Sequence, residues 1–209
     1  MHNSKTFRVA DNAAIARHIN RIRFGTLVAH GVDRFDASPL PWVAEHGTEG
    51  MVLWGHLANA NSQLEMLRRQ PRAMIVFNGE NGYITPRGLP TPKSAPTWNY
   101  IAIHLEGDCE LLDAATTEEA VERLVLHLEK DRVEPWSTSE MGDRRERLLR
   151  FVTGIRMRPR RVDAKFKLGQ NERLDDLKAI LANLEVEGHD RLAQSMRDAN
   201  AQRLAGKTP

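Results

Sequence analysis

The stretch VLWGHLANANSQLEMLRRQ, residues Val52–Gln70, decides the fold. It begins with a short apolar run, Val52–Trp54, which lies between two glycines and predicts a β-strand. A helix is expected to open at Ser62, because Ser62 and Glu65 have the spacing of a capping box. The stretch therefore predicts a strand, a polar loop and a helix in that order.

The loop between this strand and this helix is rich in polar side chains, with His56, Asn59 and Asn61 in it. The first turn of a helix has unpaired N–H groups and a partial positive charge, so this loop can form an anion site for a phosphate. The alternative is an ordinary strand-to-helix turn in which the asparagines are turn residues. The stretch alone leaves both interpretations open.

Composition limits the class of protein. The chain has 209 residues, enough for one large domain or one domain with helical additions, and its single cysteine, Cys109, excludes an internal disulfide and a zinc site built on several cysteines. We find no run of about 18 apolar residues that could cross a membrane. The N-terminal residues lack the apolar core of a signal peptide, so we expect a cytoplasmic protein. No cluster of metal-ligating residues is recognisable in the sequence, so no metal site is expected.

The formal net charge is only +2, which is lower than expected for a dedicated nucleic-acid-binding protein. The basic residues do cluster late in the chain, at Arg144, Arg145, Arg147, Arg150, Arg156, Arg158, Arg160 and Arg161. This cluster is either a solvated helix face followed by an exposed strand face, or a DNA-contacting patch.

The remaining pattern is mostly β. Phe24–Ala29 and Phe35–Ala44 predict a hairpin, and Pro39 and Pro41 make its second strand an edge strand or interrupt it. The alternative is that a ligand lies against this strand, where the N–H groups that the two prolines lack would matter less. Further strands are expected at 72–77, 96–105 and 155–162. The sequence thus predicts a mainly β fold with helical additions (α+β), a closed or split antiparallel barrel.

Local signals also predict where elements begin and end. Asp11 is a plausible N-cap for a first helix, and Thr116 with Glu119 predicts a second capping box. The Asn-Gly dipeptides at 78–79 and 81–82 predict turns. A basic helix over 143–152 is expected to stop at Gly154.

Several segments together resemble one family, the PaiB-type, FMN-binding negative transcriptional regulators of bacteria. The matching segments are FGTLVAH (Phe24–His30), LPWV (Leu40–Val43), GHLANAN (Gly55–Asn61), PTWNYIAIHLEG (Pro96–Gly107) and KFKLGQN (Lys165–Asn171). The resemblance runs from about Phe7 to Leu184, and the segments that contain PTWNY and KFKLGQN are its most specific parts.

The resemblance implies an FMN-binding split β-barrel, the fold shared with pyridoxamine phosphate oxidases and flavin reductases. The resemblance also implies a homodimer that holds FMN in clefts at the subunit interface. We therefore expect an FMN-binding split-barrel domain over residues 1–170, with inserted helices at about 117–152. A C-terminal helical extension is expected over residues 171–209.

The resemblance also implies a set of cofactor-binding residues. They are Thr26, Ser38, Pro39, Leu40, Pro41, His56, Leu57, Ala58, Asn59, Asn61, Trp98, Asn99, Lys165, Lys167 and Gln170. The oxidase branch usually grips the FMN phosphate with arginine and lysine, whereas HLANANSQ offers no cation except a protonated His56. FMN is thus expected to bind weakly, with amide donors and Lys165 or Lys167 as substitutes.

Three functions follow as expectations. The first is a flavin-binding negative transcriptional regulator that forms a homodimer and binds FMN. DNA is a further partner of such a regulator, although no recognisable motif supports it here, and no membrane association is expected. The second is an FMN-dependent oxidoreductase or flavin reductase, in which the flavin carries the electron chemistry and His56 or His104 handles protons. The third is haem binding or degradation, which needs a histidine free to be an axial ligand.

Overall fold

The computed structural model of the protein describes residues 4–206. The chain divides into two compact units. We name Asp11–Phe77 together with Ile103–Val162 the central unit. Met1–Ala10, Asn78–Ala102 and Asp163–Pro209 form the terminal unit. The division expected from the sequence, at residue 170, stays a prediction.

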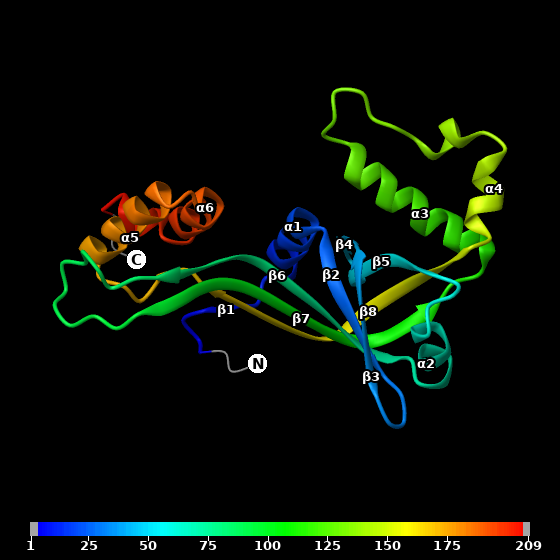
Figure 1. Ribbon diagram of the computed structural model, residues 1–209, viewed down its shortest axis with the longest axis horizontal. Coiled ribbons are helices and arrows are strands. Elements are labelled where there is room, and N and C mark those ends of the chain that lie inside the picture. The colour runs from blue at the N-terminus through cyan, green and yellow to red at the C-terminus, as the bar shows by residue number, and fades with distance from the viewer. Residues whose placement is uncertain (1–3, 207–209) are drawn as a thin grey trace. The chain divides into compact units, whose positions relative to one another are not determined.

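The described strands form one antiparallel sheet of eight strands that does not close on itself (Figure 1). Seven of them follow the order β3-β2-β6-β7-β8-β5-β4, and β1 pairs with β8. Their bounds are β1 Arg8–Val9, β2 Phe24–His30, β3 Phe35–Pro41, β4 Val43–Gly47, β5 Gly50–Ala58, β6 Arg72–Ile84, β7 Thr97–Leu111 and β8 Val152–Lys167. The expected antiparallel, mainly β fold with helical additions is confirmed, and β3 is an edge strand as its prolines predict.

The helices are α1 Asn12–Ile22, α2 Gln63–Arg69, α3 Ala114–Glu129, the 3-10 helix η1 Thr138–Met141, α4 Arg144–Leu149, α5 Leu174–Val186, α6 Asp190–Ala199 and α7 Ala201–Leu204. Asp11 caps α1 as predicted, because its Oδ1 accepts the N–H groups of Ala13 and Ala14 at 2.9 and 3.2 Å. In the terminal unit, α5 and α6 lie side by side (Figure 1). No helix within residues 4–206 is both long and apolar enough to span a membrane.

The turns expected at the two Asn-Gly dipeptides are wrong, because β6 runs without a break from Arg72 to Ile84. Neither Gly79 nor Gly82 has the positive φ that such a turn requires. In the terminal unit, a Cβ on Gly82 would lie 2.8 Å from the side chain of Leu192, so this glycine allows a close approach of α6.

The capping box expected at Thr116 is also wrong, because α3 begins three residues earlier. Asp113 is its N-cap, and its Oδ1 accepts the N–H of Thr116 at 2.8 Å. The basic helix α4 ends at Leu149, so Gly154 does not stop it and lies instead in β8. A Cβ on Gly154 would lie 2.9 Å from the Cα of Thr117, so the glycine lets α3 approach the strand.

Packing of α3 against the sheet builds the part of the central unit that holds the site. Val43, Trp54, Leu112, Ala120 and Leu124 form one buried apolar cluster between β4, β5 and α3. Since successive side chains of a strand point to opposite faces, the face of β5 that carries Trp54 also carries His56. The helices that follow β7 therefore cover His56.

Candidate functional site

Asn61 organises the turn between β5 and α2. Its Nδ2 donates to the Ser38 hydroxyl at 2.9 Å, and its Oδ1 accepts the N–H of Gln63 at 2.8 Å. The capping box expected at Ser62 is wrong, because the Ser62 side chain caps nothing and instead donates to Asp36 at 2.6 Å. Asn61 thus ties this turn to β3 and caps the helix.

The start of α2 does not fit a phosphate. The Gln63 and Leu64 N–H groups are already bonded to the Asn61 side chain and carbonyl, the second at 3.1 Å. The hydrogen bond from Ser62 lowers the pKa of Asp36, so this neighbouring carboxylate is ionised at neutral pH. A negative side chain and occupied donors leave little to attract an anion.

Asn59 also has its bonds within the chain. Its Nδ2 donates to the carbonyl of Arg150 at 2.8 Å, and its Oδ1 accepts from the Thr153 hydroxyl at 2.7 Å. The amide therefore fastens the turn to the junction between α4 and β8. His56, which the sequence placed in the loop, lies in β5, and Ala58 is the last residue of that strand.

The hairpin of β2 and β3 brings part of the predicted set together. Thr26 lies opposite Pro39, and Phe24 lies opposite Pro41, so these four residues share one face. Phe24 is 58% exposed, and Pro39 is also exposed. This flat face of ring and aliphatic carbons fits one side of a planar heterocycle. Ser38 and Leu40, opposite Leu27 and Gly25, lie on the other face.

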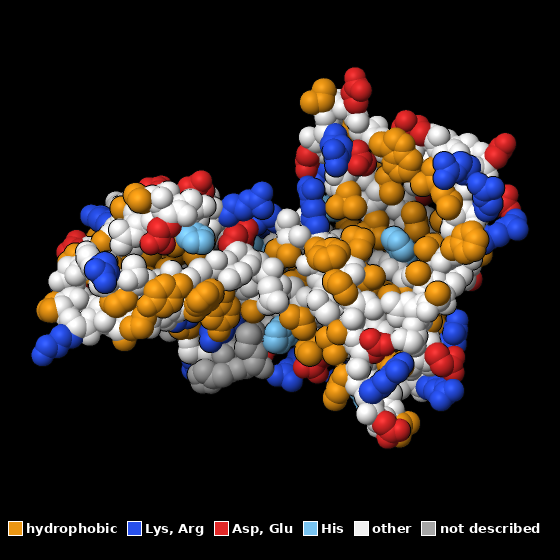
Figure 2. Space-filling view, viewed as in Figure 1, with side chains coloured by type: hydrophobic (Ala, Val, Ile, Leu, Met, Phe, Trp, Pro, Cys, Tyr) orange, Lys and Arg blue, Asp and Glu red, His pale blue; other side chains and the backbone are white. Residues whose placement is uncertain are grey.

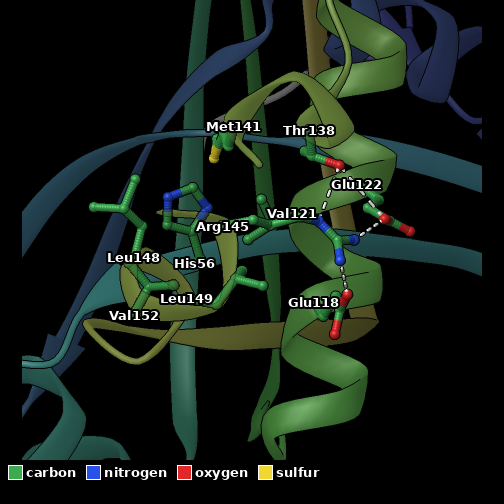
Figure 3. Close-up of a pocket in the computed structure, with 10 residues that line it drawn as sticks. All are labelled: His56, Glu118, Val121, Glu122, Thr138, Met141, Arg145, Leu148, Leu149 and Val152. Carbon is green, nitrogen blue, oxygen red and sulfur yellow. Dashed lines mark hydrogen bonds and ion pairs between the residues drawn. The ribbon is translucent and has the colours of Figure 1, made fainter. Parts of the chain in front are cut away.

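His56 and Leu57 point to opposite sides of β5. Leu57 is 1% exposed and belongs to the core. His56 lines a pocket of about 120 Å³ together with side chains of α3, η1, α4 and the first residue of β8 (Figure 3). Burial lowers the pKa of His56, so its imidazole is neutral at pH 7. The sequence did not predict this pocket, because its walls come from segments more than 50 residues away.

Two predicted residues in β7 differ sharply in exposure. Trp98 is 50% exposed, donates from Nε1 to the Asn81 Oδ1 at 3.3 Å, and forms a tilted ring pair with Tyr83 at 6.2 Å. Asn99 is fully buried, and its Nδ2 donates to the Met196 sulfur at 3.5 Å. Hydrophobic side chains also gather over β6 and β7 on the face that Figure 2 shows. Trp98 can therefore meet a ligand directly, and Asn99 cannot.

The segment KFKLGQN begins inside β8, because Lys165–Lys167 are the last residues of that strand. The Lys165 ammonium lies 5.4 Å from the ring centre of Tyr100, and Lys167 donates to the Thr97 hydroxyl. Gln170 bonds its own loop, since its Nε2 donates to the Phe166 carbonyl at 2.7 Å. The two lysines are thus the cations that this segment offers.

Other reactive side chains of the described residues provide no further centre. No group of three or more histidine, cysteine, aspartate and glutamate side chains within residues 4–206 could hold a metal ion. Burial raises the pKa of the Cys109 thiol to about 12, so it stays protonated. Gln63, which the sequence did not single out, is fully buried and donates to the carbonyls of Leu27 and Asp36 at 3.1 and 2.8 Å.

Comparisons with known proteins agree with this architecture. The family model described as "Putative FMN-binding domain" matches residues 1–161. The chain is similar to "Protease synthase and sporulation protein PAI 2" of Bacillus subtilis, with 24% identity over 95% of this chain and 97% of that protein.

Solved structures show the same fold at low identity. A FAD and haem binding protein from Mycobacterium smegmatis superposes with a TM-score of 0.59, 13% identity, and coverage of 82% of this chain and 79% of that one. The flavocytochrome Anf3 from Azotobacter vinelandii superposes with a TM-score of 0.59 and 15% identity, and the match covers 79% of this chain and 72% of that one. The fold is therefore the split barrel, and the chain belongs to the "Putative FMN-binding domain" family, as its motifs predict.

Proposed function

We propose that this protein binds FMN, with the flavin ring against the face formed by Thr26, Pro39 and Pro41. The observation that carries the proposal is the family match over residues 1–161, which includes this whole hairpin. The exposure of the face and its flat, mostly apolar character support it. When bound, the flavin would supply the redox chemistry, and the chain would hold and orient it.

The phosphate is proposed to lie away from the start of α2, because the donors there are occupied and Asp36 is ionised. Lys165 and Lys167 of the terminal unit are the cations that the family motif offers instead, and we assign them to the second subunit of a homodimer. Trp98 is proposed to stack on the flavin from the second subunit of a homodimer, which its exposed indole permits. The side chain of His56 is left out of this site, because it lies in its own pocket.

A titration that compares FMN with riboflavin tests the phosphate assignment. Replacing Lys165 and Lys167 together by alanine should weaken FMN binding at least tenfold, about 1.4 kcal/mol, and leave riboflavin binding unchanged. The matched control is Lys178→Ala, an exposed lysine on α5, which should change neither affinity. Equal affinities for FMN in the double variant and the parent would remove both lysines from the site.

The biological role is proposed to be negative control of transcription, as in the family that the motifs resemble. The late basic cluster gives little support for direct DNA contact. Six of its arginines form ion pairs with carboxylates of the same unit: Arg145, Arg150, Arg156, Arg158, Arg160 and Arg161. Such a face carries little unpaired positive charge, so the interpretation of a solvated surface is the better supported. DNA binding with a steep salt dependence would overturn that interpretation.

The alternative function is an FMN-dependent oxidoreductase. NADH or NADPH oxidation that requires added FMN would favour it over a purely regulatory role. The haem interpretation gains a candidate ligand in His56, but about 120 Å³ is far below the roughly 300 Å³ at which pockets for drug-sized ligands begin. The size of this pocket therefore gives no support to haem binding at His56.

A further inference from the structure

One face of the terminal unit carries an exposed indole and a cation on neighbouring strands. The strands β6, β7 and β8 follow one another in the sheet. Alternation along β7 puts Trp98 and Tyr100 on one face. Asn99 lies on the other face, where it is buried and donates to the Met196 sulfur of α6. The Lys165 ammonium of β8 lies 5.4 Å from the ring centre of Tyr100, so it shares the face of the indole.

Two side chains of β6 hold the Trp98 indole in place. The Trp98 Nε1 donates to the Asn81 Oδ1 at 3.3 Å, and the Trp98 ring lies 6.2 Å from the Tyr83 ring at an interplanar angle of 57°. Such a tilted arrangement is one that aromatic pairs prefer. Asn81 and Tyr83 are two residues apart in a continuous strand, so both side chains point to the face of Trp98. A turn at residues 81–82, as the sequence predicted, would have separated them.

The amide of Asn81 is itself oriented toward the indole. Its Nδ2 donates to the carbonyl of Gly79 at 3.1 Å, which leaves Oδ1 as the atom that faces Trp98. The opposite orientation would place an NH₂ group against the indole N–H, and two donors cannot bond each other. A hydrogen bond within β6 thus selects the orientation of the amide that can hold the indole.

The Trp98 indole is held although much of it is exposed. Trp98 is 50% exposed and Tyr83 is 51% exposed, so neither ring gains the full benefit of burial. Fixing an exposed side chain costs rotamer entropy. A ligand that stacks on an indole already fixed in place avoids that cost at the moment of binding, so its affinity is higher. The two contacts from β6 therefore favour a ligand that stacks on Trp98.

We infer that Asn81 and Tyr83 are positioning residues for Trp98. They fix the indole in the orientation in which it stacks on the flavin, and neither needs to touch the flavin itself. Because they act through Trp98, this role rests on the proposed function, in which Trp98 stacks on FMN. Their effect on FMN affinity should then disappear when the indole is removed.

A double-mutant cycle on FMN affinity tests this dependence, with calorimetric titrations of the full-length protein. Asn81→Ala and Tyr83→Ala should each weaken FMN binding about fivefold, and neither should weaken it further in the Trp98→Ala background. Tyr83→Phe keeps the ring and should bind FMN as the parent does. Asn78→Ala, at an exposed asparagine of the same strand, is the matched control for Asn81 and should change nothing.

Spectroscopic readouts separate positioning from a general effect on folding. An indole stacked on a flavin quenches the flavin's fluorescence, so Trp98→Ala should restore the emission of bound FMN. Asn81→Ala and Tyr83→Ala should restore part of it at saturating FMN, where a loss of affinity no longer matters. In the FMN-free protein, ¹⁵N relaxation of the Trp98 indole, assigned by its loss in Trp98→Phe, should show greater mobility in both alanine variants.

The possible failures are distinguishable in the same titrations. FMN binding by the parent that neither Asn81→Ala nor Tyr83→Ala weakens would overturn the positioning role and leave the flavin proposal standing. Equal losses with and without the Trp98 indole would also overturn the role, because the two residues would then act by another route. Absence of FMN binding by the parent would overturn the proposed function and the positioning role together.

Discussion

Two regions that lie only a few residues apart in the chain differ in how far their polar side chains are hydrogen-bonded. In the turn after β5, Asn59 and Asn61 form hydrogen bonds through both atoms of their amides. In β5 itself, His56 leaves its buried Nδ1 unpaired. The amides therefore fix the turn in place, whereas no hydrogen bond offsets the burial of His56 Nδ1.

The largest effect should come from the turn. Asn61→Ala removes the cap of α2 and the bond to Ser38, and each contributes about 1 kcal/mol, so the free energy of unfolding should fall by about 2 kcal/mol. Urea denaturation measures it. Ser62→Ala, which loses one exposed hydrogen bond to Asp36, is the control and should lose less than about 1 kcal/mol. Equal losses in the two variants would mean that Asn61 is not the organising residue.

The pocket should respond in the opposite direction. His56→Phe replaces an unpaired polar ring by an apolar one among apolar walls, so the free energy of unfolding without ligand should rise by about 1 kcal/mol at pH 7.5. The same denaturation experiment measures it, with His46→Ala, at an exposed histidine on β4, as the control. A clear loss of stability would show that His56 has a structural partner, and the contrast with the turn would fail.

The smallest effect is a dependence on pH. Because burial lowers the pKa of His56 below its ordinary 6.5, the unfolded chain binds the proton more readily, and stability should fall as the pH drops below 6.5. His56→Phe should lose less stability than the parent between pH 7.5 and 5.5. Glu118, Glu122 and Arg145 also face the pocket but are present in both proteins. Parallel pH profiles would contradict the burial of a neutral imidazole.

Much of the fold follows from local sequence. The spacing of isoleucines after Asp11 and of leucines after Leu174 gives α1 and α5, because an amphipathic helix repeats its apolar side chains with a period near 3.6. The alternation along β8 is similarly readable, with Ile155 and Met157 buried and the arginines between and after them facing outward. The family motifs then narrowed the predicted barrel to the split type and added the expected cofactor.

Signals that compete with tertiary pairing were misleading. An Asn-Gly dipeptide favours a turn in isolation, but β6, which lies between β2 and β7 in the sheet, continues through residues 78–82, beyond the stretch 73–76 that pairs with β2. Likewise, Ser62 and Thr116 had the right spacing for capping boxes, yet Asn61 and Asp113 cap those helices. Which nearby oxygen caps a helix depends on the position at which the preceding strand ends.

The sequence by itself determined the strand and helix pattern, the antiparallel barrel class and the family of this protein. Only the tertiary structure decided which polar groups are free to act. Partners for the late arginines come from strands and helices distant in sequence, and so do the apolar walls around His56. The physical reason is that hydrogen bonds, ion pairs and burial depend on distances between segments, which no local pattern of residues encodes.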